Sequence, residues 1–165
     1  MLKYVDTAVT FAEVPDEITL CINISNCPCH CVGCHSSYLA QDIGNPLRDD
    51  LWKLIRYNKG ISCVAFMGGD ADPSEINDLA KIIRNSGLPI RVAWYSGRNE
   101  LSPLIDIENF DYIKIGSYQE ERGALNNSNT NQRFYQVVKP TGIGVNLHDK
   151  YVLSDITYRF CGENQ

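Results

Sequence analysis

Four of the seven cysteines in this chain lie within eight residues, inside the segment 26–35 (NCPCHCVGCH). Three of them have the spacing Cys27-x3-Cys31-x2-Cys34, and Cys29 stands between the first two. Thiolates are soft ligands that suit iron–sulfur clusters or zinc. Three closely spaced thiolates can hold three irons of a [4Fe–4S] cluster and leave the fourth iron open, as a catalytic zinc keeps one position free. The spacing therefore predicts a catalytic metal centre.

Structural zinc is the alternative for the same segment. Cys29 would add a fourth thiolate, and His30 or His35 can substitute for a cysteine. Structural zinc sites usually draw two ligand pairs from separate parts of the chain, and no second pair is present. Cys29 also lies only two residues from both Cys27 and Cys31, which leaves little room for tetrahedral geometry. The pattern favours iron–sulfur chemistry over zinc.

The other cysteines, Cys21, Cys63 and Cys161, stand singly in apolar or strand-like surroundings. A free cysteine in such a place usually acts as a small hydrophobic residue. The total is odd, and the N-terminus lacks the basic start and apolar stretch of an export signal. We therefore expect no disulfide framework and a cytoplasmic location.

Size and charge limit the remaining possibilities. A chain of 165 residues fits a single domain, 1–165. The net charge of −5 argues against a nucleic-acid partner. No apolar run reaches the length of a membrane span, so no membrane partner is expected.

Strand and helix patterns alternate along the chain. A first helix is expected where Leu51, Leu54 and Ile55 recur at helical spacing, after Asp49 and before Gly60. The segment 101–109 has a weaker helical or irregular pattern. Strands are predicted at 18–25, 61–67, 90–95 and 112–115, with late strands at 134–139 and 156–160.

The second helix has the clearest boundaries. Asp72 fits the N-cap, Pro73 the first helical position, and Glu75 the reciprocal position of a capping box. Gly87 follows the last residue of its apolar face, so the helix should end there.

Alternating strands and helices predict parallel pairing through right-handed crossovers. The chain is too short to close an eight-fold barrel, which typically takes about 250 residues. We therefore expect an α/β fold in the form of an incomplete (β/α) barrel with a mostly parallel sheet and an open side. Ligands gather at the carboxyl ends of such strands, so the cysteine loop, 68–70, 96–98 and 116–118 should share one rim.

The cysteine loop after the first strand resembles the signature of the radical S-adenosylmethionine (radical SAM) enzymes. More narrowly, the chain resembles the anaerobic ribonucleoside-triphosphate reductase activating proteins, which are small and share several later segments. Cys29 departs from the family pattern, and 137–150 matches no family motif. The segments that carry the likeness are 26–39 (NCPCHCVGCHSSYL), 66–73 (FMGGDADP), 94–97 (WYSG), 111–116 (DYIKIG), 130–134 (TNQRF) and 155–160 (DITYRF).

The resemblance implies two cofactors: a [4Fe–4S] cluster held by Cys27, Cys31 and Cys34, and S-adenosyl-L-methionine bound to the open iron. In the superfamily, one electron from the reduced cluster splits this sulfonium into methionine and a 5′-deoxyadenosyl radical. The implied substrate is a backbone glycine of the large anaerobic reductase, which becomes a glycyl radical. A one-electron donor such as flavodoxin or ferredoxin is the other implied partner.

The resemblance also suggests which residues bind S-adenosylmethionine. Gly68, Gly69 and Asp70 match the family's glycine-glycine-acid motif, which meets the methionyl amine; a simple tight turn is the other reading. Ser96 and Arg98 lie where the third strand of the family meets the adenosyl group. Arg98 pairs with the methionyl carboxylate or is a solvated surface residue.

Other readings stay open for the remaining polar residues. Lys114 sits inside a strand pattern, where a lysine needs either solvent or an anion, and it is a further candidate for binding S-adenosylmethionine. Asn131, Gln132 and Arg133 contact a cofactor or partner, or belong to an ordinary polar loop. Two other functions also remain: a radical SAM enzyme with another glycyl-radical partner or a small-molecule substrate, and a zinc-stabilised module without catalysis.

Overall fold

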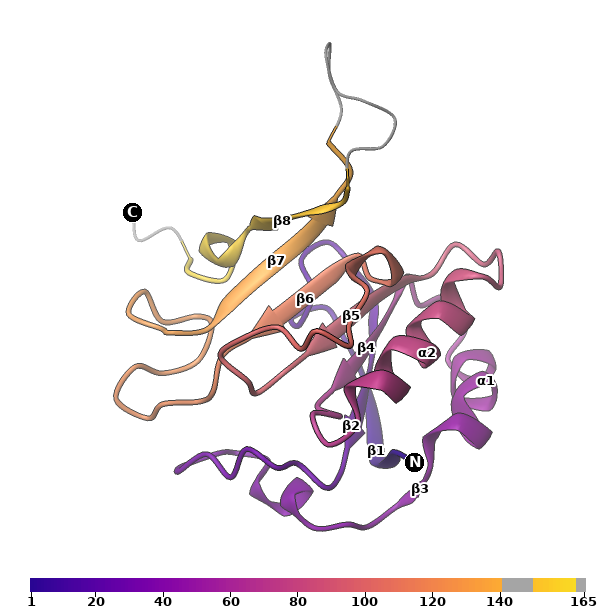
Figure 1. Cartoon of the computed structure of the whole chain (residues 1–165), viewed down its shortest axis with the longest axis horizontal. Coiled ribbons are helices and arrows are strands. Elements are labelled where there is room, and N and C mark those ends of the chain that lie inside the picture. Colours follow the sequence, from indigo (N-terminus) through magenta and orange to yellow (C-terminus); the bar gives the residue numbers. More distant parts are fainter. Residues whose placement is uncertain (141–149, 163–165) are drawn as a thin grey trace.

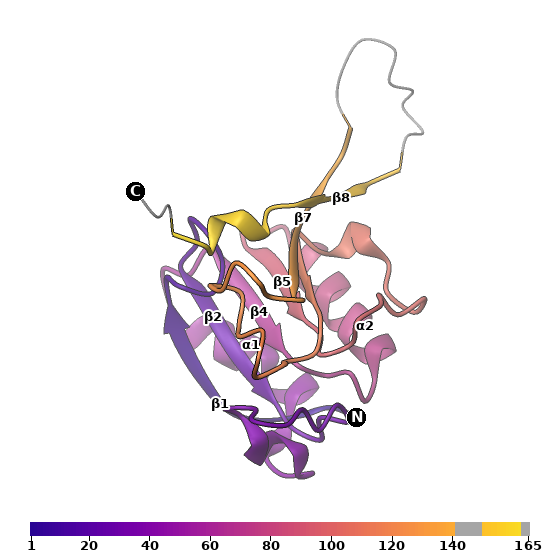
Figure 2. The same ribbon diagram turned by 90° about the vertical axis from the view of Figure 1, so that its left-hand side faces the viewer.

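One eight-stranded mixed sheet organises the chain in a computed structural model that describes residues 1–140 and 150–162. The strand order is β3-β1-β2-β4-β5-β6-β7-β8, and the two outermost strands do not pair, so the sheet is not closed. Two α-helices cover one face (Figure 1). We call the opposite face the inner face; Figure 2 looks onto it, with the helices behind the sheet.

The elements have the following bounds. The strands are β1 (Lys3–Thr10), β2 (Thr19–Ile24), β3 (Asn45–Pro46), β4 (Cys63–Met67), β5 (Arg91–Tyr95), β6 (Tyr112–Ile115), β7 (Arg133–Val138) and β8 (Val152–Asp155). The α-helices are α1 (Leu47–Tyr57) and α2 (Pro73–Arg84). Short 3-10 turns are η1 (Ser37–Ala40), η2 (Ile107–Asn109) and η3 (Thr157–Arg159). None of the helices described is long and apolar enough to cross a membrane.

The sheet is mixed, whereas the sequence predicted a mostly parallel one. Its central pairings, β2 with β4, β4 with β5 and β5 with β6, are parallel. The outer pairings, β1 with β2, β1 with β3, β6 with β7 and β7 with β8, are antiparallel. A parallel pairing needs a long crossover, usually through a helix. The helices α1 and α2 lie in two of the parallel crossovers and the segment 96–111 with η2 forms the third, whereas β6 returns to β7 as an antiparallel neighbour through the loop 116–132.

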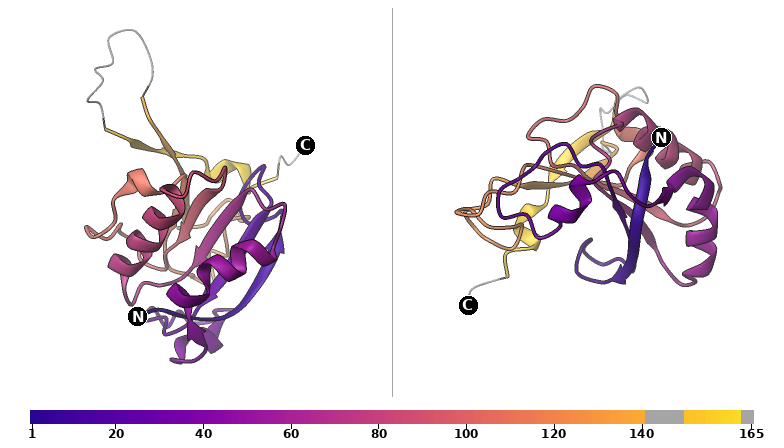
Figure 3. Two further views of the ribbon diagram at one scale, coloured as in Figure 1. Left: turned by 90° about the vertical axis from the view of Figure 1, so that its right-hand side faces the viewer. Right: turned by 90° about the horizontal axis from the view of Figure 1, so that it is seen from below.

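Apolar residues on alternate positions of the central strands form the main core under the helices. Leu20, Val64, Phe66 and Trp94 are buried there against α1 and α2. Burying aliphatic and aromatic side chains in this way is the main favourable term in folding. The helices lie together on this side of the sheet, as the left panel of Figure 3 shows.

The start of α2 confirms the predicted N-cap and corrects the predicted capping box. Asp72 Oδ1 accepts a hydrogen bond from the backbone N–H of Glu75 at 3.0 Å. Glu75 does not bond back to Asp72. Its buried carboxylate instead accepts from the backbone N–H of Leu2 at 2.6 Å and from Arg48 Nε at 3.4 Å. The carboxylate that the local pattern assigns to the capping box is therefore bound by residues that are distant in the sequence.

The inner face carries a second, smaller core. Cys21, Cys63, Tyr112 and Phe134 are buried in it. Burial raises the pKa of Cys21 to about 12 and that of Cys63 still further. Both cysteines thus act as small hydrophobic residues, as the sequence predicted.

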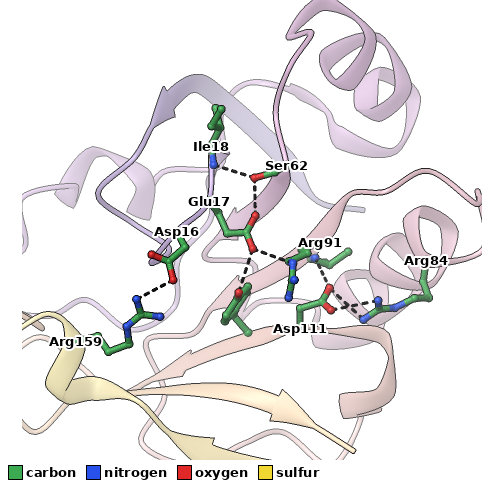
Figure 4. Close-up of polar contacts among 10 residues, drawn as sticks. Asp16, Glu17, Ile18, Ser62, Arg84, Arg91, Asp111 and Arg159 are labelled. Atoms are coloured by element: carbon green, nitrogen blue, oxygen red, sulfur yellow. Dashed lines mark hydrogen bonds and ion pairs between the residues drawn. The ribbon is translucent and has the colours of Figure 1, made fainter.

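A polar network closes the end of this face that lies at the amino ends of the central strands (Figure 4). The buried carboxylate of Glu17 accepts from Ser62 Oγ at 2.5 Å and from Tyr112 OH at 3.1 Å, and it pairs with Arg91 at 2.9 Å. Beside it, Arg159 pairs with the exposed Asp16 at 2.8 Å. The last contact joins the segment before β2 to η3, across the open side of the sheet.

One segment near the end of the chain and one near its start differ from the sequence prediction. Residues 156–160, predicted as a strand, form η3 instead, and β8 precedes them. The reason is local, because Asp155 Oδ1 accepts from the backbone N–H and the hydroxyl of Thr157 at 2.9 and 2.6 Å. Such side-chain caps compete with strand pairing. The edge strand β1 was not predicted; only Tyr4 is buried in it, so its pattern is weak.

Candidate functional site

A cavity of about 680 Å³ opens on the inner face at the carboxyl ends of the central strands. Its volume falls within the roughly 300–1,000 Å³ that is usual for small-molecule and cofactor sites. The cysteine loop forms one wall, and the strand ends and the loop after β6 form others. The lining residues used below are Cys27, Cys29, Cys31, Cys34, Tyr95, Gly97, Lys114, Gly116, Tyr118, Leu125, Gln132 and Phe160.

The rim predicted from the sequence is confirmed by hydrogen bonds between neighbouring strand ends. Asp70, after β4, accepts from Ser96 Oγ at 2.5 Å and from the backbone N–H of Gly97 at 2.8 Å, both after β5. Gly116, after β6, donates its N–H to the carbonyl of Arg98 at 2.6 Å. Three parallel strands therefore end in one connected layer, as expected for the carboxyl edge of such a sheet.

The cysteine loop is folded by its own backbone and held from outside. The N–H of Cys27 donates to Leu39 O at 2.9 Å, which closes the segment into a loop. His30 has a φ of +46°, an uncommon left-handed conformation for a residue other than glycine. The cysteine loop also lies beside the segment after β6, as Figure 1 and the right panel of Figure 3 show. Gly33 marks this contact, because a Cβ there would be 3.3 Å from the carboxyl of Glu120 and 3.5 Å from the ring of Tyr118.

Cys27, Cys31 and Cys34 line the same cavity as free thiols. In the part of the chain that the structure describes, no three His, Cys, Asp or Glu side chains converge enough to hold a single metal ion. A tetrahedral zinc site needs such convergence on one point. A cluster is bonded to each cysteine through a different iron, so its thiolates need only surround a common space. Three soft thiols on the wall of one cavity are the type of donor that such a cluster takes.

Cys29 has a different environment from its three neighbours. Its Sγ lies 3.8 Å from Asp70 Oδ2, and it would lie 2.8 Å from a Cβ on Gly97. Burial and the Asp70 carboxylate raise the pKa of this thiol to about 12. Cys29 is thus fixed against the ends of β4 and β5.

Gly68 and Gly69 stand where the backbone conformation, and at Gly69 also the available space, favours glycine. Gly68 and Gly69 both have left-handed φ values, +103° and +91°, which glycine adopts without strain. A Cβ on Gly69 would also collide with the side chain of Ile76, at 2.5 Å. The Gly68 carbonyl accepts from Trp94 Nε1 at 2.8 Å, and the Gly69 carbonyl accepts from the N–H of Asp72 at 3.0 Å. Each carbonyl keeps one lone pair for a further donor.

Lys114 is buried within the cavity wall, with 8% of its surface exposed. Its Nζ donates to the carbonyl of Gly116 at 2.7 Å and to that of Ser96 at 3.4 Å. Burial lowers the pKa of Lys114 to about 8, while the charges of Asp70 and of the loop cysteines oppose that shift. A buried ammonium group near the thiols gives the cavity one positively charged wall.

The structure divides the residues that the resemblance assigned to S-adenosylmethionine. Lys114 lines the cavity together with the three cysteines. Asp70 and Ser96 are buried behind Gly97 and bonded to one another. Arg98 is exposed on the rim. Arg98, Gly68 and Gly69 all lie outside the cavity lining.

Much of the cavity comes from residues that the sequence reasoning did not place in the site. Tyr95 donates its hydroxyl to the carbonyl of Glu13, which fixes the segment after β1 beneath the cavity. Leu125 and Phe160 add apolar wall from the loop after β6 and from the residue after η3. Tyr95 and Phe160 fall within the segments 94–97 and 155–160 that carry the family likeness, whereas Leu125 does not; only the tertiary fold brings the three together.

Comparison with protein-family models, with characterised proteins and with solved structures finds no match. The class that fold and site define is an α/β protein with an open mixed sheet and a thiol-lined cavity at its carboxyl edge.

Proposed function

We propose that this chain is a radical SAM activating enzyme that generates a glycyl radical on the large anaerobic ribonucleoside-triphosphate reductase. The observation that carries the proposal is that Cys27, Cys31 and Cys34 line one cavity with the buried Lys114 at the carboxyl edge of the parallel strands. The motif order along the chain supplies the family and the substrate.

The cofactors would supply the difficult chemistry, since a [4Fe–4S] cluster with S-adenosylmethionine gives one-electron cleavage of the sulfonium to methionine and a 5′-deoxyadenosyl radical. The three cysteines would hold the cluster, each through one iron. Cys29, fixed against Asp70, would remain a neighbour of the cluster.

The remaining residues would bind and orient S-adenosylmethionine. Lys114 has one N–H left for an anionic group such as the methionyl carboxylate, because two of its three donors are used by carbonyls. The resemblance assigns the methionyl amine to Gly68 and Gly69, although both lie outside the cavity lining. Asp70 would act from behind them, since its oxygens already hold Ser96 and Gly97 in place.

The open sheet supports a protein substrate rather than an enclosed small molecule. The outermost strands β3 and β8 do not meet, so the inner face is not surrounded by strands. A glycine on a loop of the partner needs such an opening to approach the cavity. We therefore regard the sheet as an incomplete (β/α) barrel of the radical SAM type. The resemblance supplies the class of electron donor, flavodoxin or ferredoxin.

The test is anaerobic reconstitution with iron and sulfide, reduction, and addition of S-adenosylmethionine. Chromatography should then detect 5′-deoxyadenosine and methionine in the native protein and neither in Cys31→Ala. With the large reductase present, electron paramagnetic resonance should detect a glycyl radical. A colourless protein that contains zinc and forms neither product would overturn the proposal.

A further inference from the structure

Gln132 is a buried polar residue of the cavity to which the proposed function gives no task. Only 6% of its surface is exposed, and it lines the same cavity as the cysteine thiols. Its backbone is bonded locally, to Thr130 Oγ1 and to the guanidinium of Arg133. Within residues 1–140 and 150–162, no hydrogen bond involves its carboxamide. Among the described residues, the carboxamide of Gln132 is not one of the fully buried side-chain groups that lack a partner, and at the cavity wall it is available to a ligand.

The fold directs this side chain toward the inner face. Phe134, two residues later, belongs to the inner-face core, and residues two apart in extended chain share a face. Phe134 pairs with Lys114 on β6, so Gln132 and Lys114 are diagonal neighbours on that face. Gly116 lies directly beside Gln132, because a Cβ there would be 2.8 Å from Gln132 Cα. No side chain at position 116 therefore stands between the carboxamide and the cavity.

We propose that Gln132 is a specificity-determining residue that recognises the adenine base of S-adenosylmethionine; this inference rests on the proposed function. A carboxamide presents an N–H donor and an oxygen acceptor side by side in one plane. Adenine presents the complementary pair on one edge, the N6 amino donor beside the N7 acceptor, and glutamine binds that edge through two hydrogen bonds.

The peptide group of a partner protein matches this residue less well. In a planar trans peptide the C=O and N–H point in opposite directions, so one peptide group cannot satisfy both halves of a carboxamide. A flat base also suits the rest of this wall. Tyr118, Leu125 and Phe160 line the same cavity and offer apolar and aromatic surface to the faces of a ring.

The test compares two nucleosides that differ at position 6 of the base and, as a consequence, in whether N1 carries a proton. S-adenosylhomocysteine carries the N6 amino group, and S-inosylhomocysteine carries an oxygen there, which turns the donor into an acceptor. Equilibrium dialysis against the reconstituted protein measures both affinities without turnover. The wild type should bind the adenosyl compound roughly 10- to 100-fold more tightly, as expected for one bidentate pair.

The variant Gln132→Met keeps an unbranched side chain of similar length and removes the carboxamide. It should bind both nucleosides with similar affinity. Gln136→Met is the matched control, because Gln136 lies on β7, the strand that follows Gln132, and outside the cavity lining; it should keep the wild-type preference. Iron content and thermal unfolding would show that each variant is folded. If Gln132→Met does not fold, Gln132→Asn takes its place in the test. This variant shortens the side chain and keeps its polarity, and it should lose part of the preference.

The outcomes separate this inference from the proposed function. A wild type that cleaves S-adenosylmethionine but shows no preference, or a preference that survives in Gln132→Met, overturns the role of Gln132 alone. A wild type that neither binds the nucleosides nor forms 5′-deoxyadenosine overturns both.

Discussion

The Sγ of Cys29 fills the space beside Gly97, where a Cβ would lie 2.8 Å from the sulfur and 3.3 Å from Cys29 Cβ. Gly97 and Cys29 also share a partner, because Asp70 Oδ2 accepts the Gly97 N–H at 2.8 Å and lies 3.8 Å from the thiol. Glycine at this position therefore lets the cysteine loop close onto the end of β5.

This contact predicts that Gly97→Ala destabilises the cluster-free protein by about 1–3 kcal/mol, the usual cost of overpacking a filled site. The same substitution should cost much less in a Cys29→Ala background, where the sulfur is gone. Urea unfolding of the four proteins gives the coupling between the two positions. Equal costs in both backgrounds would show that Cys29 does not occupy this space.

Local sequence rules predicted the elements that carry their own signals. Asp72 and Pro73 marked the first turn of α2 correctly, because the cap is made within one turn of chain. The meeting of the cysteine loop with Gly68, Ser96 and Gly116 followed from parallel strands alone. These predictions needed no knowledge of distant contacts.

The rest depends on partners that local sequence does not specify. Glu75 had the right spacing for a capping box, yet Leu2 and Arg48 take its carboxylate. The strand pattern of 156–160 was overridden by the Asp155 side chain. For Gln132 the sequence left open a contact with a cofactor or partner and an ordinary polar loop, and only the fold buries it in the cavity wall.

The different environments of the loop cysteines predict different effects on iron binding. Cys31→Ala should abolish cluster binding, because the proposed cluster has three protein ligands and Cys31 is one of them. Cys29→Ala should retain the iron, because its thiol is turned toward Asp70. Iron and sulfide analysis after reconstitution measures both. Cys161→Ala, outside the cavity lining, is the control; equal loss of iron in the Cys29 and Cys31 variants would contradict the ligand assignment.

Two neighbouring acids should differ in their contribution to stability. Glu17 is buried and accepts from Ser62, Tyr112 and Arg91, so Glu17→Gln places an amide donor against groups that all donate. We expect a loss of roughly 1–3 kcal/mol in the free energy of unfolding.

Asp16→Asn is the matched control, since Asp16 is exposed and its pair with Arg159 lies in solvent. Exposed pairs contribute roughly 0–1 kcal/mol, so this variant should unfold close to the wild type in urea. Similar losses in the two variants would mean that Glu17 is not the buried centre of the network.

Tyr112 should make the protein less stable at alkaline pH. Burial, then the charge and hydrogen bond of Glu17, raise the pKa of Tyr112 to about 12 from its ordinary value of 10.0. Between these values the unfolded chain loses the phenolic proton while the folded protein keeps it. The stabilisation is therefore complete below about pH 10 and declines as the pH rises toward 12.

Comparison with Tyr112→Phe isolates this effect, because the buried Cys21 thiol, which titrates in the same direction, is present in both proteins. At pH 8 the wild type should be more stable by about 1 kcal/mol, the usual net value of one hydrogen bond. That advantage should shrink steadily in urea unfolding at pH 10, 10.5 and 11, since only the wild type can gain free energy by ionising this residue on unfolding. An advantage that stays constant up to pH 11 would show that Tyr112 ionises alike in both states, and that the Glu17 network does not hold its proton.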